Sequence, residues 1–94
     1  MSNCRYLTAI GVHIRQESDD NFIFYWNERG YEGNAVTASI IQACRIERNV
    51  DQLVVRICRE FQVDREEARV DIEEIVQQLC ETGILLNQFQ GGIQ

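Results

Sequence analysis

The sequence predicts an α+β fold in which a small three-stranded antiparallel sheet is followed by three helices, the element order of a winged helix-turn-helix. Over the first third of the chain, apolar residues alternate with other residues, the period of a strand with one buried face. From residue 34 onward they recur every three or four residues, the period of an amphipathic helix. A short apolar segment, residues 84–86, then follows a pair of tightly joined helices and can add to a sheet as the wing.

The strands are predicted from alternation and from turn residues. Residues 10–15 alternate, and the polar residues 18–21 supply the turn of a hairpin. The run 21–26 is aromatic and β-prone on both faces, which indicates a strand with helices against one side. A second turn at 27–30 leaves residues 31–33 as a short third strand at the edge of the sheet.

Two capped helices are predicted next. Asn34 is a suitable N-cap for a helix that runs through about Cys44. Asn49 is a suitable N-cap for the second, with Gln52 at the position of a capping box. Apolar residues within 50–61 then recur at three- and four-residue spacing, which is the clearest amphipathic pattern in the chain.

The last helix should be the longest, because both of its ends are marked in the sequence. Asp64 is a good N-cap, Glu67 completes a capping box, and Gly83 supplies the left-handed residue that ends a helix. Between these ends one face is apolar and the opposite face is mostly acidic. Only Gln62 and Val63 separate this helix from the preceding one, which predicts a tight turn.

Length and charge restrict the function. The 94 residues predict a single domain, with an ordered core at about 10–86 and a polar tail at 87–94. The net charge of −6 argues against a nucleic-acid partner, because affinity for phosphate backbones comes mostly from Lys and Arg. No apolar run is long enough to span a bilayer and the N-terminal sequence lacks the pattern of a signal peptide. We therefore expect no membrane partner and a cytoplasmic location.

Neither a metal site nor an enzyme active site is predicted. Cys4, Cys44, Cys58 and Cys80 form no Cys-x-x-Cys motif, and His13 is the single histidine, so no zinc set and no cofactor are expected. The last three cysteines lie on or beside the apolar stripes of predicted helices, where free cysteine behaves as a small hydrophobe. Their convergence on a redox or metal site is the alternative. The sequence shows no nucleophile-base pair and no glycine-rich phosphate loop, so the chain is not expected to be an enzyme.

Small and apolar residues recur at set intervals across residues 10 to 86. They comprise Asn34 and Ala38, Val50 and Leu53, residues 61–64, and a closing pattern of Asp71, Ile72, Ile75, Val76, Leu79 and residues 83–86. In these residues and in its element order the chain resembles the PqqD-like proteins, also called RiPP recognition elements. The closing pattern is the most distinctive part of this resemblance.

The resemblance implies a non-catalytic peptide-binding module. Members of this family hold the leader segment of a ribosomally made precursor peptide and present its core to a modifying enzyme, often a radical-SAM protein. The leader is implied to pair with the edge of the third strand, in a groove between that strand and the last helix. Backbone pairing gives sequence-tolerant affinity, and pockets along a groove select side chains. A winged-helix DNA-binding transcriptional regulator is the alternative function, against which the acidic last helix argues.

The groove residues are assigned by geometry. On a helical wheel, one flank of the last helix mixes apolar and charged groups, and a peptide groove needs apolar surface. The predicted peptide-binding residues on this flank and on the strand edge are Tyr25, Tyr31, Glu32, Gly33, Arg69, Glu73, Val76, Gln77 and Cys80. The alternative for each helix residue is that it borders the core and faces water, and for each tyrosine that it is an ordinary solvent-edge aromatic. An acidic rim favours a leader that carries lysine or arginine, and a free edge favours self-pairing into a homodimer as readily as leader pairing.

Overall fold

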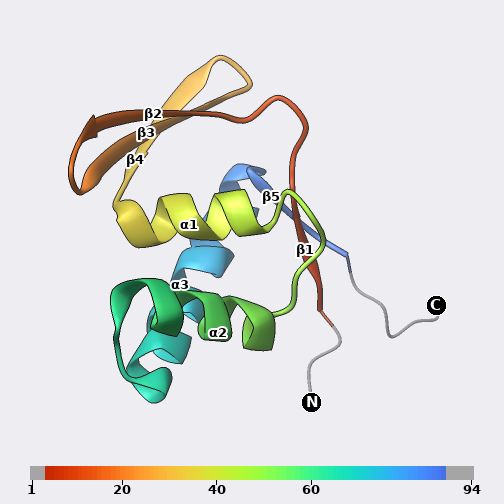
Figure 1. Cartoon of the computed structure of the whole chain (residues 1–94). Helices are drawn as coiled ribbons and strands as arrows, with labels where there is room; N and C mark the ends of the chain where they lie inside the picture. Colours follow the sequence, from red (N-terminus) through yellow and green to blue (C-terminus); the bar gives the residue numbers. More distant parts are fainter. Residues whose placement is uncertain (1–3, 89–94) are drawn as a thin grey trace.

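The computed structural model describes residues 4–88, and these form five strands and three helices. In chain order the elements are β1 (Tyr6–Thr8), β2 (His13–Ser18), β3 (Asn21–Trp26), β4 (Arg29–Gly33), α1 (Ala35–Ala43), α2 (Val50–Phe61), α3 (Arg65–Thr82) and β5 (Leu85–Asn87). Figure 1 shows the β2, β3 and β4 sheet lying along one side of α1, with α2 on the other side. The α+β class with three helices is confirmed, and the predicted tail lies outside the described residues from 89 onward.

The larger sheet has the order β2-β3-β4, with both neighbouring pairs antiparallel. β3 occupies the residues predicted for it, 21–26. β2 begins at His13, three residues later than predicted, because Ile10 and Gly11 form a turn in which Gly11 has φ +95° and Ile10 is 99% exposed. The His13 side chain is exposed, as alternation predicts.

β4 is longer than predicted, with five residues where the sequence indicated three at 31–33. The reason is the turn that precedes it. Asn27 and Glu28 alone connect β3 to β4, with φ of 55° and 64°. Positive φ at both positions is typical of the two-residue turns whose twist matches a hairpin, so pairing resumes at once with Trp26 opposite Arg29.

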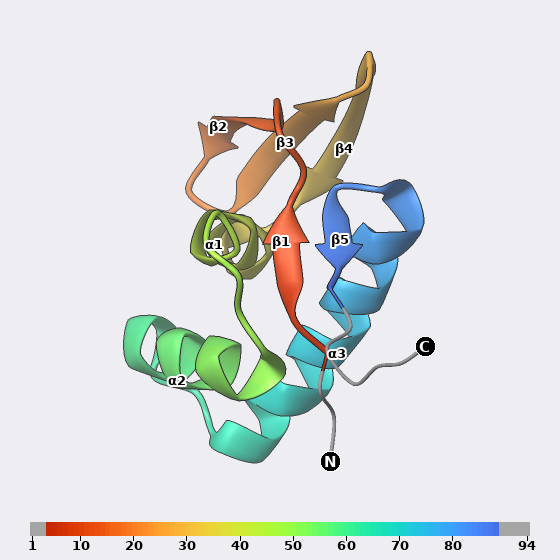
Figure 2. The same cartoon turned by 90° about the vertical axis from the view of Figure 1, so that its right-hand side faces the viewer.

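A second sheet was absent from the sequence prediction. β1 pairs antiparallel with β5, with Leu7 opposite Leu86, and Figure 2 shows the two strands side by side in front of α3. Residues 84–86 were expected to add to a sheet as a wing, and β5 does pair as a strand, but with β1 in a sheet separate from β2-β3-β4, so the winged helix-turn-helix is not confirmed. Strand β1 was missed because three residues are too few to show a period of two.

The helices begin at the predicted N-caps, although of the capping box predicted at Asp64 and Glu67 the structure shows only the Asp64 half. The side chains of Asn34, Asn49 and Asp64 each accept hydrogen bonds from backbone N–H groups in the first turn of their helix. The backbone N–H of Asn49 donates in return to the side chain of Gln52 at 2.9 Å, which completes the predicted capping box. Gly83 ends α3 in the left-handed conformation, with φ +91°.

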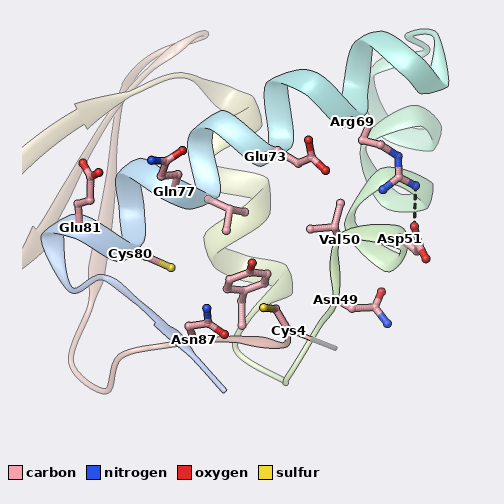
Figure 3. A pocket seen from close by; sticks show the side chains of 12 residues that line it. Cys4, Asn49, Val50, Asp51, Arg69, Glu73, Gln77, Cys80, Glu81 and Asn87 are labelled. Atoms are coloured by element: carbon pink, nitrogen blue, oxygen red, sulfur yellow. Dashed lines mark hydrogen bonds and ion pairs between the residues drawn. The ribbon is translucent and has the colours of Figure 1, made fainter. Parts of the chain in front are cut away.

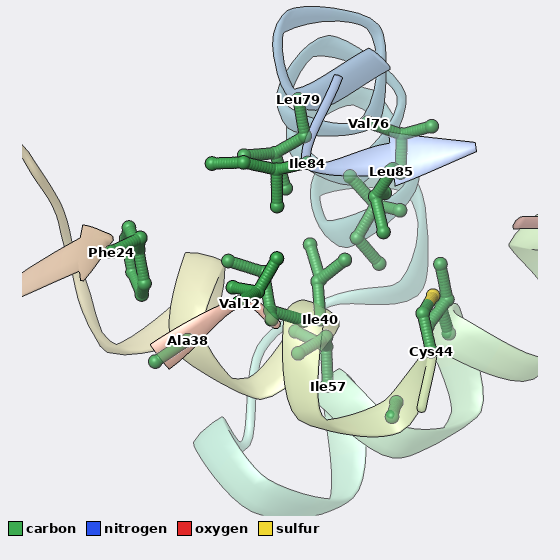
Figure 4. Close-up of a cluster of buried hydrophobic side chains, with 14 of the residues drawn as sticks. Val12, Phe24, Ala38, Ile40, Cys44, Ile57, Val76, Leu79, Ile84 and Leu85 are labelled. Atoms are coloured by element: carbon green, nitrogen blue, oxygen red, sulfur yellow. The ribbon is translucent and has the colours of Figure 1, made fainter. Parts of the chain in front are cut away.

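The core lies mainly between the three helices, where Ile84 and Leu85 close it and Phe24 enters it from the larger sheet (Figure 4). Its largest fully buried side chains are Phe24, Ile40, Ile41, Leu53, Ile57, Ile72, Ile84, Leu85, Val54 and Cys44. Cys58 and Cys80 are partly buried against this core, which supports their interpretation as small hydrophobes. Among the described residues, no helix has both the length and the apolarity needed to cross a bilayer.

Candidate functional site

A groove of about 730 Å³ opens between β1, the start of α2 and α3 (Figure 3). Sites that hold small ligands typically enclose roughly 300–1,000 Å³, so this groove has the volume for several side chains of a bound peptide. The residues that line it are Cys4, Tyr6, Asn49, Val50, Asp51, Arg69, Glu73, Val76, Gln77, Cys80, Glu81 and Asn87.

One wall of the groove is the flank of α3 that the helical wheel selects. Arg69, Glu73, Val76, Gln77 and Cys80 all line it, because residues three or four apart lie above one another on a helix. Val76 is only 3% exposed and Cys80 is half-buried, whereas Glu73 and Gln77 are exposed. The wall therefore has an apolar floor and a polar rim.

The opposite wall consists of residues that sequence reasoning did not select. Tyr6 comes from β1, and Val50 and Asp51 open α2. The backbone N–H of Tyr6 donates to the carbonyl of Arg48 at 2.7 Å, and that of Arg48 donates back to Tyr6 at 3.0 Å. This bridge holds the start of α2 beside β1. No local signal marks it, because its partners are more than forty residues apart.

The four predicted residues of the larger sheet do not line this groove. Tyr31 packs half-buried against the core, and Gly33 has no room for a side chain, because an added Cβ would lie 2.6 Å from the Phe24 ring. Tyr25 lies on the other face of the sheet, with the Arg15 guanidinium 6.0 Å from its ring centroid, and Glu32 is exposed. The structure therefore brings the α3 residues together and leaves the β4 residues on a separate surface.

That separate surface is the outer edge of β4. In the sheet order β4 pairs with β3 on one side, and among residues 4–88 no strand pairs with its other side. A two-residue hairpin closes on a hydrogen-bonded pair, here Trp26 and Arg29, and such pairs alternate along the strands. The backbone groups of Gly30 and Glu32 therefore point away from β3, where an added strand would meet them.

The rim of the groove is acidic. Arg69 Nη2 donates to Asp51 Oδ1 at 2.5 Å, and this hydrogen bond raises the pKa of Arg69 above its usual value. Arg69, the basic side chain of the lining, is thus paired with Asp51. Glu73 and Glu81 take part in no ion pair within the described chain. Their carboxylates and that of Asp51 outnumber the single guanidinium of the lining.

The floor of the groove is uncharged. Burial, together with the neighbouring Cys4, Cys80 and Glu73, raises the pKa of Tyr6 to about 12. Burial also raises the pKa of the Cys80 thiol. Figure 3 shows the side chains of Cys4 and Cys80 pointing into the groove from opposite sides. The phenol and the thiol are therefore protonated at neutral pH and add neutral surface beside Val50 and Val76.

The fold and these two surfaces define a class of small α+β scaffold with an open sheet edge and a peptide-sized groove. The chain belongs to the PqqD family, because the family model described as coenzyme PQQ synthesis protein D matches residues 23–85. This match confirms the family resemblance read from the sequence.

Among solved structures, the chain is similar to one titled "TbiB1 in Complex with the TbiA(beta) Leader Peptide". The TM-score is 0.66 and the sequence identity is 19%, and the match covers 94% of this chain and 99% of that one. At this identity the likeness shows a shared fold. A comparison with curated proteins gave no significant match.

Proposed function

We propose that this protein is a non-catalytic recognition element that binds the leader segment of a ribosomally synthesised precursor peptide. It presents the precursor to a modifying enzyme, such as a radical-SAM protein, in the cytoplasm. Membership of the PqqD family over residues 23–85 is the observation that carries this proposal. The solved structure of similar fold holds a leader peptide, which supports a peptide as the ligand.

In the proposed mode, the leader adds as a strand to the outer edge of β4. Gly30 and Glu32 offer it outward backbone groups, and a five-residue edge is long enough for several backbone hydrogen bonds. Tyr25, Tyr31 and Gly33 lie on or beside this edge and complete the proposed contact. The α3 residues that line the groove are the second proposed contact of the peptide.

A DNA-binding regulator is the weaker candidate. The exposed face of α3 carries mostly acidic side chains, and the chain has a net charge of −6. Phosphate backbones are bound chiefly through Lys and Arg, so this helix would be repelled from a DNA groove. No observation in the structure favours this candidate.

Titration of the purified protein with a fluorescently labelled leader tests the proposal. The leader is taken from a small open reading frame beside the gene, and we expect a Kd of roughly micromolar or tighter. Glu32→Pro should weaken binding about two- to tenfold, because proline removes an outward N–H donor. Gln16→Pro is the matched control and should leave binding unchanged. By the same alternation of hydrogen-bonded pairs, the backbone groups of Gln16 point outward from the opposite edge of the sheet, on β2.

Three results would count against the proposal. Failure of every neighbouring leader to bind, or binding of a promoter fragment in its place, would remove the peptide-recognition function. Equal effects of the two prolines would show that the β4 edge is not the site. Circular dichroism of both variants checks that the fold is intact before affinities are compared.

A further inference from the structure

We propose that the groove between β1, α2 and α3 binds a lysine- or arginine-bearing segment of the same precursor peptide, outside the part that pairs with β4. This inference rests on the proposed function and assigns the groove a specificity of its own. The ligand is a short extended peptide whose basic side chains meet Glu73 and Glu81 while its apolar side chains lie on the floor.

The groove and the β4 edge are two surfaces. None of the residues that line the groove belongs to β2, β3 or β4. A strand added to β4 therefore does not fill the groove, which leaves the groove open to a second segment. Its concave shape and volume of about 730 Å³ suit a few extended residues, and a folded partner surface would not enter it.

Charge indicates which side chains the groove accepts. Among the described residues, Arg69 is hydrogen-bonded to Asp51 and also lies near Glu73, so three carboxylates of the lining, those of Asp51, Glu73 and Glu81, face a single guanidinium. Figure 3 shows the side chains of Glu73 and Glu81 along the α3 wall, at opposite sides of Gln77. A basic side chain gains a partner here, whereas an acidic one meets two like charges.

The spacing of the two glutamates restricts the ligand further. They are eight residues apart on α3, which at 1.5 Å per residue separates them by about 12 Å along the helix axis. An extended peptide covers that distance in roughly four residues at about 3.3 Å each, and residues four apart point to the same side. The groove should therefore prefer two basic residues at positions i and i+4 over two adjacent ones.

Weak charge pairs also favour a tethered ligand. An exposed ion pair contributes little, so a free peptide should bind the groove only weakly, at concentrations that a titration followed by amide signals can reach. A segment attached to a leader already paired with β4 binds intramolecularly, at an effective concentration in the roughly millimolar range. The longest dimension of the molecule is 41 Å, so about 12 extended residues are enough to connect the two surfaces.

The experiment uses the whole chain labelled with nitrogen-15 and a nine-residue probe, acetyl-SLKSVSKLS-amide, with its lysines four residues apart. We expect its addition to shift the backbone amide signals of Glu73, Cys80 and Asn49. A probe with glutamate in place of both lysines should leave these signals unchanged. A probe with adjacent lysines should bind more weakly.

Variants then test the charges. Glu73→Gln and Glu81→Gln should each weaken the lysine probe about two- to fivefold. Glu74→Gln is the matched control, because Glu74 is exposed on the same helix and does not line the groove. The double variant E73Q/E81Q should also weaken the full precursor, but should not affect a precursor truncated to its β4-pairing segment.

The outcomes separate this inference from the proposed function. The inference is wrong if the acidic probe causes equal shifts, or if both glutamine variants bind the lysine probe with unchanged affinity. In either case, leader binding that is weakened by Glu32→Pro would still support the proposed function. If the modifying enzyme moves the groove signals and the precursor does not, the proposed occupant is wrong. If no precursor binds to the unmodified protein, the proposed function itself is wrong, and the inference that rests on it is wrong as well.

Discussion

Replacing Gly83 by alanine tests how the end of α3 is held against the larger sheet. Gly83 has φ +91°, and an added Cβ would lie 2.8 Å from Cζ3 and 2.9 Å from Cη2 of Trp26. Trp26 is half-buried against the core. The substitution therefore imposes two separate costs, a strained backbone and a displaced indole ring.

The expected loss can be estimated from these two costs. A residue with a Cβ in the left-handed conformation costs about 1–2 kcal/mol, and overpacking costs about 1–3 kcal/mol. A combined loss of roughly 3 kcal/mol is a large part of the 5–15 kcal/mol that typically stabilises a domain. For a chain of this length it should lower Tm by about 12–24 °C.

Gly11→Ala is the matched control for the backbone cost. Gly11 has φ +95°, but nothing lies within 4 Å of the position of its added Cβ. Its replacement should cost only about 1–2 kcal/mol, from backbone strain alone. Thermal and urea unfolding followed by circular dichroism measure both variants. Equal losses would show that Trp26 does not resist the methyl group, and no loss in either would refute the left-handed conformations.

Two further predictions concern a helix cap and a partly buried tyrosine. Asp64→Ala should lower the free energy of unfolding in urea by about 1 kcal/mol, because the Asp64 side chain accepts hydrogen bonds from the N–H groups of Glu66 and Glu67. Asp71→Ala, on the exposed face of the same helix, is the control and should cost little. Equal losses in the two variants would show that the Asp64 cap does not stabilise the helix. Partial burial, with Cys4, Cys80 and Glu73 nearby, raises the pKa of Tyr6 from 10 to about 12, so the folded state favours the neutral phenol. That stabilisation is complete below pH 10 and is lost as the pH rises toward 12. Ultraviolet absorbance should show one tyrosine ionising late, with Tyr6→Phe removing that step, and a common titration of all three tyrosines would contradict it.

Local signals predicted the helices well. A cap acts within four residues of its own position, so Asn34, Asn49, Asp64 and Gly83 fix the helix ends wherever the helices finally pack. The strands depend on partners. Neither the length of β4, set by positive φ in the turn before it, nor the pairing of β1 with β5 leaves a periodic pattern in the sequence.

The same distinction explains which part of the groove was predictable. Helical spacing alone places Arg69, Glu73, Val76, Gln77 and Cys80 on one flank, so the α3 wall follows from the sequence. The opposite wall, formed by β1 and the start of α2, could not be predicted from the sequence, because it forms only when residues that are distant in the chain pair.

The backbone bridge between Tyr6 and Arg48 assembles that second wall. It carries the start of α2 to β1, while β1 is held by β5 immediately after α3. The β4 edge is built from a different hairpin, β3 and β4, which needs neither of these pairings. Loosening β1 should therefore open the groove and leave the β4 edge intact, so the two proposed peptide contacts are separable in energy as well as in position.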